Sequence, residues 1–174
     1  NPHVMAKTYW LICTTDENFE ITRARGFSVQ GVDSRQRRRA VRMTADDRIV
    51  YYIADLRRFA ATATVTSECF EEHTPIWKHH TGSEDFPHRV KVRPDIVLDK
   101  ERYLDALQIG PRLEYVKKWP PELWHLALVD TLHIIPQKDF NFLEDEMRRL
   151  ASPRPGGRRG RRRGRRRRPS RASA

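Results

Sequence analysis

Trp77 is the residue of this 174-residue chain whose surroundings most directly suggest a binding role. It lies in a polar stretch, after His73-Thr74-Pro75-Ile76 and before Lys78-His79-His80. A large apolar ring that a proline-containing loop presents can stack on a nucleobase, and such a contact contributes about 1–3 kcal/mol per base. The same ring could instead close the end of a sheet as a hydrophobic plug. The sequence leaves both interpretations open.

A run of arginines forms the second candidate site. On the predicted helix Arg35–Met43, residues four apart would repel one another by a few tenths of a kcal/mol, a cost that an anionic partner would relieve. We therefore predict a phosphate-binding face, to which Lys78 is added as a further cation. The alternative is a solvated face that Asp16, Glu17 and Glu20 balance in three dimensions. The predicted phosphate-binding residues are Arg35, Arg37, Arg38, Arg39, Arg42 and Lys78.

The net charge of +11 belongs to the C-terminal segment. Eleven of the 34 basic residues are arginines in the range 153–174, which has no acidic residue, so 23 basic and 23 acidic residues remain in 1–152. A tail of Arg, Gly, Pro and Ser cannot bury enough apolar surface to fold, and we expect it to be disordered. Its arginines would bind phosphates without sequence preference. A solubilising role, or contact with acidic partners or anionic lipid, is the alternative.

Catalytic and metal-binding patterns are missing from the sequence. His79, His80, Glu84, Asp85 and His88 form the one metal-like group, and their spacing fits no zinc motif. The two cysteines, Cys13 and Cys69, have no CxxC spacing and suit a reducing compartment. No apolar run approaches the ~20 residues of a membrane span. We expect a soluble, cytoplasmic, monomeric binding protein without metal, cofactor or catalytic residues.

The predicted elements indicate one domain over residues 7–152, after an N-terminal extension of residues 1–6. Apolar and alternating runs predict strands at 8–14, 48–54, 60–68 and 89–98, the third half-exposed. An N-cap at Asp16 and a left-handed Gly26 delimit the first helix. Further helices are expected at 35–43, 100–108, 112–118 and 137–150, the last with Leu150 on its apolar stripe, and a short apolar segment at 126–129. This order favours an α/β (α+β) fold, a pseudo-β-barrel of mixed strands flanked by helices.

Five segments in order resemble an EVE domain of the PUA-like superfamily, related to YTH and ASCH domains. They are YWLICTT (9–15), GFSVQG (26–31), MTADDRIVYY (43–52), EEHTPIW (71–77) and RLEYVKKWP (112–120). The resemblance implies a non-enzymatic reader that takes a flipped, modified base into a pocket: methylated or hydroxymethylated cytosine in DNA, or methylated adenine in RNA.

Carried over by position, the resemblance assigns the pocket residues. Thr14 and Thr15 would contact the base edge, Phe27, Ser28 and Gln30 would line the pocket, and Trp77 would stack on the ring. Asn18, Tyr52 and Trp119 are candidate rim residues. Hydroxyl and amide groups beside one tryptophan favour cytosine over adenine. The alternative is a small-ligand or protein-interaction module whose tail alone binds RNA, and metal dependence at His79, His80 and His88 would instead indicate a hydrolase or nuclease.

Overall fold

The computed structural model describes residues 6–78, 85–117, 128 and 130–151. The predicted tail, most of the N-terminal extension, Trp119 and most of the segment 126–129 therefore lie outside the described residues. No helix within the described ranges is long and apolar enough to cross a lipid bilayer.

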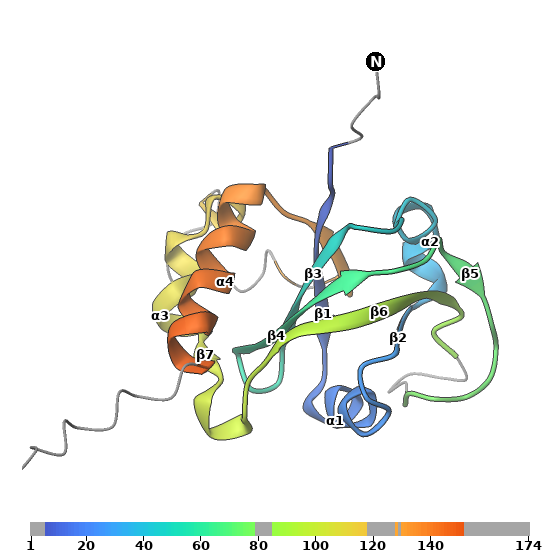
Figure 1. Cartoon of the computed structure of the whole chain (residues 1–174), viewed down its shortest axis with the longest axis horizontal. Coiled ribbons are helices and arrows are strands. Elements are labelled where there is room, and N and C mark those ends of the chain that lie inside the picture. The colour runs from blue at the N-terminus through green and yellow to red at the C-terminus, as the bar shows by residue number, and fades with distance from the viewer. Residues whose placement is uncertain (1–5, 79–84, 118–127, 129, 152–174) are drawn as a thin grey trace, which may run out of the picture.

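The described strands form one strongly curled mixed sheet (Figure 1). Its main path is β2-β6-β4-β3-β1-β8, with β5 added to β6 and β7 added to β4. All pairs are antiparallel except β1 with β3. The strands are β1 (Tyr9–Thr14), β2 (Val29–Val32), β3 (Arg48–Ile53), β4 (Arg58–Val65), β5 (Phe70–Glu71), β6 (His88–Val97), β7 (Leu104–Asp105) and β8 (Leu132–Ile134).

Two irregularities of strand register explain the curl. The β3–β4 pairing shifts between Tyr51 and Tyr52, and the β4–β6 pairing shifts between Thr62 and Ala63. An extra residue in one strand bends it and increases its twist. The ten-residue strand β6 consequently pairs with β4 at its C-terminal part and with β2 at its N-terminal part. The result is a curled half-barrel of mixed strands, in agreement with the expected pseudo-β-barrel of mixed strands flanked by helices.

Helices cover the curled sheet on separate sides. In Figure 1, α3 (Ala106–Ile109) and α4 (Gln137–Ala151) lie on one side, and α1 (Asp16–Ala24) and α2 (Arg37–Ala40) lie toward the other. The remaining helical turns are of the 3-10 type and span Ser34–Gln36, Lys100–Arg102, Gly110–Arg112 and Glu114–Val116.

The core lies inside the curl and beneath α4. Trp10, Phe19, Tyr51 and Phe59 are fully buried, and Phe140 of α4 packs on Tyr9. Each such side chain contributes about 1.5–3 kcal/mol by leaving water.

Several predictions about elements hold and others fail. Strands β1, β3 and β6 and helix α4 agree with the predicted ranges to within two residues, and Gly26 is left-handed at φ +71°. The N-cap of α1 is Thr15, one residue earlier than predicted, because its Oγ1 accepts from the Asn18 amide. Strand β4 is buried almost throughout instead of half-exposed, since the curl encloses it. Leu150 is exposed rather than part of the α4 stripe.

The prediction of one helix over Arg35–Met43 is wrong. A 3-10 turn over Ser34–Gln36 leads into the four-residue helix α2, so the segment is no continuous helix. The arginine spacing that the prediction used therefore does not describe one helix face.

Candidate functional site

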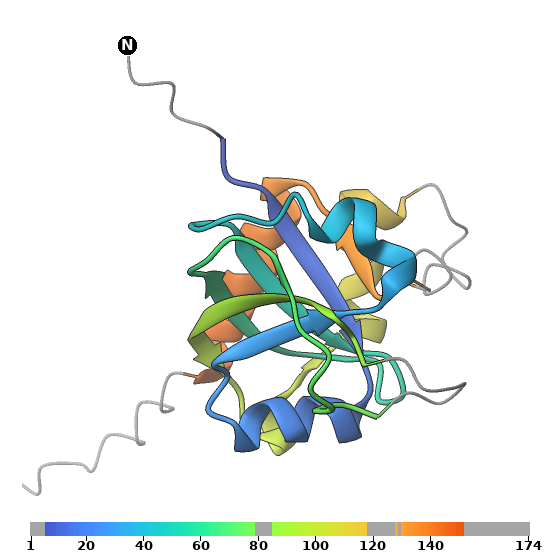
Figure 2. The same ribbon diagram turned by 90° about the vertical axis from the view of Figure 1, so that its right-hand side faces the viewer.

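A single cavity of about 220 Å³ is the strongest candidate site in the described part of the chain. It opens where the C-terminal end of β1, the start of α1, strand β2 and the segment after β5 come together, a region that Figure 2 turns toward the reader. Pockets for drug-sized ligands typically measure about 300–1,000 Å³, so this cavity fits a smaller group such as one ring system. Six predicted site residues line it: Thr14, Thr15, Asn18, Gln30, Trp77 and Lys78.

The ring of Trp77 forms one wall of the cavity in a fixed orientation. Its Nε1 donates to Thr22 Oγ1 of α1 at 2.8 Å, and the residue is only 7% exposed. Phe86 also lines the cavity, and its ring stands at 77° to that of Trp77 with the centroids 6.1 Å apart. The cavity therefore has two aromatic walls nearly at right angles, although the sequence singled out only one of them.

Gly31 makes room for this arrangement. A Cβ at this position would lie 2.5 Å from Cζ3 of Trp77 and 2.6 Å from the carbonyl oxygen of Phe86. Any larger residue would therefore displace one or both aromatic walls. Gly31, which ends the GFSVQG segment, is needed because a side chain at that position would have no space. Gly26, at the start of the segment, is needed for its positive φ, and a Cβ there would meet no atom within 4 Å.

Asn18 fixes the backbone next to Trp77. Its Nδ2 donates to the Lys78 carbonyl at 2.8 Å, and its Oδ1 accepts from the Lys78 amide at 2.9 Å. Both halves of the side-chain amide are therefore committed to the loop, so Asn18 supports the cavity wall. Lys78 itself pairs with Glu17 at 2.8 Å, and this hydrogen bond raises the pKa of the lysine.

Three side chains supply polar groups to the cavity. The Nε2 of the buried Gln30 donates to the Gly31 carbonyl at 2.9 Å, and among the described residues its Oε1 has no partner. Thr15 Oγ1 accepts from the Asn18 amide, which leaves its hydroxyl proton available to donate. The Thr14 hydroxyl makes one long bond, 3.4 Å, to the Thr15 carbonyl. The cavity can thus accept a hydrogen bond at Gln30 and exchange hydrogen bonds at the two threonines.

Cys13 lines the cavity as a neutral thiol. Burial, with smaller contributions from Asp55 and Asp130, raises its pKa to about 12. The Sγ atom lies 3.4 Å from the Leu128 carbonyl, to which the thiol donates. A reactive cysteine needs the opposite shift of its pKa, so this thiol is no nucleophile at neutral pH.

Three residues predicted for the pocket or its rim do not line the cavity. Phe27, which has a positive φ of 54°, is 4% exposed and packs in the core against Phe19 and Tyr51. Ser28 is exposed and donates to the Arg25 carbonyl. Tyr52 is buried against Phe59.

Six lining residues were not assigned from the sequence. The GFSVQG segment offered a signal for Gly31, because a glycine in a strand often marks a close approach. The others carry no residue-type signal of their own. They are Ile12, Cys13, Gly31, Ala54, Phe86 and Thr131.

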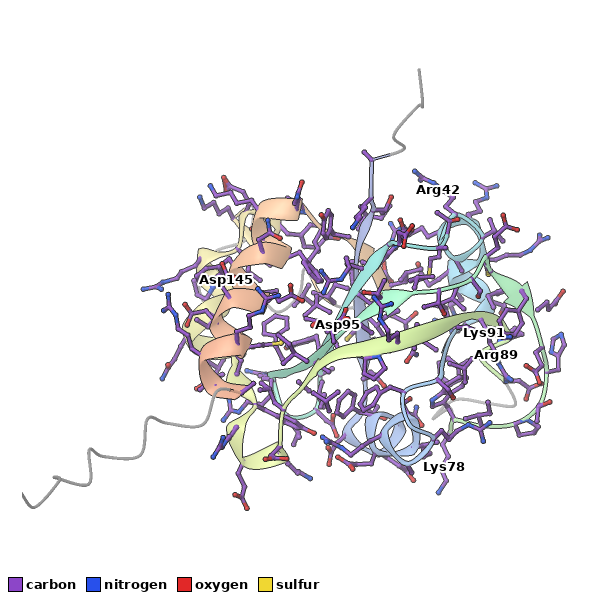
Figure 3. All side chains as sticks on the ribbon, in the orientation of Figure 1. Arg42, Lys78, Arg89, Lys91, Asp95 and Asp145 are labelled. Atoms are coloured by element: carbon purple, nitrogen blue, oxygen red, sulfur yellow. The ribbon has the colours of Figure 1, made fainter. Side chains whose placement is uncertain are left out.

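The predicted phosphate-binding residues do not form one group. In Figure 3, Arg42 lies at the upper edge of the molecule and Lys78 at the lower edge. Arg39 is engaged internally, since its Nη1 donates to the Leu132 carbonyl at 2.8 Å. Arg35, Arg37, Arg38 and Arg42 are exposed, and none of them has an ion-pair partner within the described ranges.

The predicted metal-like group is only partly visible. His79, His80 and Glu84 lie outside the described residues, and the residues that are described contain no group of three or more His, Cys, Asp or Glu side chains arranged to hold a metal ion.

The structure therefore defines a curled half-barrel domain with an aromatic-walled cavity as its candidate site. The sequence profile of the EVE domain matches residues 8–144, and the chain belongs to this family. A UPF0310 protein of Pyrococcus abyssi is 28% identical over 148 residues, which are 79% of this chain and 97% of the relative.

Solved structures share the fold at low sequence identity. Human THYN1, in complex with DNA that contains 5-methylcytosine, superposes with a TM-score of 0.54 at 15% identity, over 80% of this chain and 98% of THYN1. The YTH domain-containing protein mmi1, in complex with RNA, gives a TM-score of 0.57 at 12% identity over 81% of each chain.

Proposed function

We propose that this EVE domain binds nucleic acid and accepts a flipped, modified base in the cavity beside Trp77. The observation that carries the proposal is the pair of aromatic walls around a volume of about 220 Å³. An enzyme or reader that takes a base out of the stack needs a ring surface, partners for the Watson–Crick edge and a closely fitting pocket. Trp77 and Phe86 provide the first, and Gln30 with the two threonines provides the second.

The polar groups favour an amino-bearing base. The free Oε1 of Gln30 is an acceptor, and the exocyclic amino groups of cytosine and adenine are donors. Thymine and uracil present a carbonyl at the corresponding position and would leave Gln30 facing another acceptor. The small volume favours the pyrimidine, so we propose methylated or hydroxymethylated cytosine ahead of methylated adenine. The 5-methylcytosine DNA bound to THYN1 and the RNA bound to mmi1 support the general class of ligand.

The methyl group itself contributes modestly. Burying one methyl-sized group is worth about 0.8 kcal/mol, which is about a fourfold preference over the unmodified base. Larger discrimination would require the enclosed shape of the cavity to reject the unmodified base as well.

We assign the binding of the nucleic-acid phosphate backbone to cations outside the cavity. Arg35, Arg37, Arg38 and Arg42 are exposed and without carboxylate partners in the part of the chain that the structure describes. Such groups neutralise phosphates without reading sequence. The arginines of residues 153–174 would add to this sequence-independent affinity. In this proposal the protein is a binding module and not an enzyme.

The experiment compares Trp77→Ala with the wild type. Fluorescence anisotropy would measure the Kd of short DNA and RNA strands, single and double, each carrying cytosine, 5-methylcytosine, 5-hydroxymethylcytosine, adenine or N6-methyladenine. Loss of the stacked contact should weaken the preferred modified strand by about 5- to 150-fold. The matched control is Phe142→Ala, which removes a partly buried ring from α4, on another side of the sheet.

Two results would reject the proposal. One is a wild-type protein that binds no modified strand more tightly than its unmodified counterpart. The other is a modified-base preference that survives Trp77→Ala. A body that binds none of these strands while the tail alone retains RNA affinity would favour the small-ligand or protein-interaction alternative.

A further inference from the structure

Arg89 is a fully buried arginine that does not line the cavity beside Trp77. It lies in β6, and its relative exposure is 0%. A buried guanidinium is costly unless its donors are bonded. Its Nε donates to the Phe86 carbonyl at 3.1 Å, and its Nη2 donates to the carbonyls of Asp85, at 3.0 Å, and Thr74. A half-exposed carboxylate, Glu72, lies 3.6 Å from Nη1. One side chain therefore satisfies three backbone carbonyls.

These three carbonyls lie on both sides of Trp77 in the chain, within the segment that carries Trp77 and Phe86. Thr74 precedes Trp77, whereas Asp85 and Phe86 follow it. The Cζ atom of Arg89 also lies over the Trp77 ring, 5.2 Å from its centroid. Arg89 itself is not among the lining residues of the cavity. The guanidinium thus touches Trp77 directly and holds the backbone of Phe86.

The sheet register explains how the arginine reaches this place. Arg89 pairs with Gly31 of β2 and with Phe70 of β5. Since Gly31 has no side chain, the space beside its backbone is filled by the Trp77 ring and the Phe86 carbonyl. Arg89 and Gly31 therefore act on the same two aromatic residues, one by holding them and the other by leaving them room.

We propose that Arg89 is a positioning residue that fixes the orientation of the Trp77 and Phe86 walls before any ligand enters. This inference rests on the proposed function only for its consequence in base binding. Pre-organised walls reduce the ordering cost of binding, so their loss should weaken the bound state. A lysine would keep the charge but lacks the planar fork that serves three carbonyls at once.

The test uses full-length Arg89→Met and Arg89→Lys proteins, with Arg93→Met as the matched control. Arg93 lies in the same strand, carries the same charge and has a side chain that is 66% exposed. Nitrogen-15 NMR of the indole N–H groups would report on Trp77, whose resonance Trp77→Phe identifies. Trp10 serves as the internal reference for the fold, because its Nε1 donates to Asp47 at 2.9 Å in the core.

We expect the Trp77 resonance to shift or broaden in Arg89→Met and Arg89→Lys while the Trp10 resonance stays in place. The Kd for the strand with 5-methylcytosine should rise by about 5- to 150-fold, and its ratio to the unmodified strand should approach one. Arg93→Met should leave both the Trp77 resonance and the ratio of the two Kd values unchanged. A merely stabilising role would lower the melting temperature and leave the base preference unchanged.

An unchanged Trp77 resonance in Arg89→Met would overturn the inference. If Arg89→Met loses the Trp10 resonance as well, the variant has lost its fold, and Arg89→Lys becomes the test. A lysine variant with the wild-type Trp77 resonance and the wild-type base preference would then overturn the inference. If the wild type prefers no modified base but the Trp77 resonance still moves in the Arg89 variants, the positioning role stands and the proposed function fails.

Discussion

Replacing Gly31 with alanine is the sharpest test of the cavity, because it adds one methyl group at a known distance from both aromatic walls. That methyl would lie 2.5 Å from Cζ3 of Trp77 and 2.6 Å from the Phe86 carbonyl oxygen, well inside van der Waals contact. Gly31 has no positive φ, so the backbone itself accepts alanine. The effect of the substitution is therefore steric.

Two opposing contributions determine the stability of this variant. Overpacking of a fixed site costs about 1–3 kcal/mol, whereas removing a glycine from a strand stabilises the fold by about 0.5–1 kcal/mol. The net loss in unfolding free energy should therefore be about 0–2.5 kcal/mol. Base binding has no such compensation, because the ring of Trp77 must move. We expect the affinity for the modified strand to fall by about 5- to 150-fold.

Denaturant unfolding and anisotropy titrations on the full-length variant separate these two effects. Gly26→Ala is the matched control: a Cβ there meets nothing within 4 Å, and the cost arises from its φ of +71°. The control should lose about 1 kcal/mol of stability and retain base preference. If Gly31→Ala keeps both the wild-type affinity and the wild-type preference, Trp77 and Phe86 do not form the binding walls.

Three further predictions concern charged groups. Arg37→Met should lower the affinity for modified and unmodified duplexes equally and reduce the slope of log K against log salt by about 0.9. Arg39→Met should chiefly lower the melting temperature, because Arg39 donates to the backbone carbonyl of Leu132. Burial lowers the pKa of His133 below its ordinary 6.5. Protonation on acidification therefore favours the unfolded state, and stability present above pH 6.5 is lost below it. Between pH 7.5 and pH 5, the unfolding free energy of His133→Gln should fall less than that of the wild type. Arg48→Met should cost about 1–3 kcal/mol in denaturant unfolding, since Glu144, whose side chain is 7% exposed, loses a 2.5 Å partner and keeps Arg148 at 3.1 Å. An unchanged midpoint would contradict this.

The parts of the fold that the sequence predicted are those governed by local pattern. The apolar run of β1 and the stripe of α4 each indicate their element without reference to the rest of the chain. Strand β8 was not predicted, because three residues are too few to show a period. The short α2 was predicted too long, since a 3-10 turn over Ser34–Gln36 precedes it and the helix ends at Ala40.

The cavity was predictable where one segment brings its own residues together, and it was not where the sheet register does so. Thr14, Thr15 and Gln30, which the family resemblance assigned, are among the lining residues. Phe27 lies in the core rather than among the lining residues, at a positive φ that residue type does not reveal in a phenylalanine. The contribution of Arg89 depends on its pairing with Gly31, which no local pattern predicts.

The separation of Arg42 from Lys78 has a consequence for how a strand would lie on this domain (Figure 3). Lys78 lies at the cavity but is already paired with Glu17, so a phosphate near it must compete with a carboxylate 2.8 Å away. Arg42, which follows α2, lies at the other edge of the view, and neither it nor Arg35, Arg37 and Arg38 has an ion-pair partner within the described ranges. Phosphate affinity should therefore depend more on the α2 region than on the cavity mouth. Base selectivity, which depends on Trp77, should then vary little with salt while total affinity varies strongly.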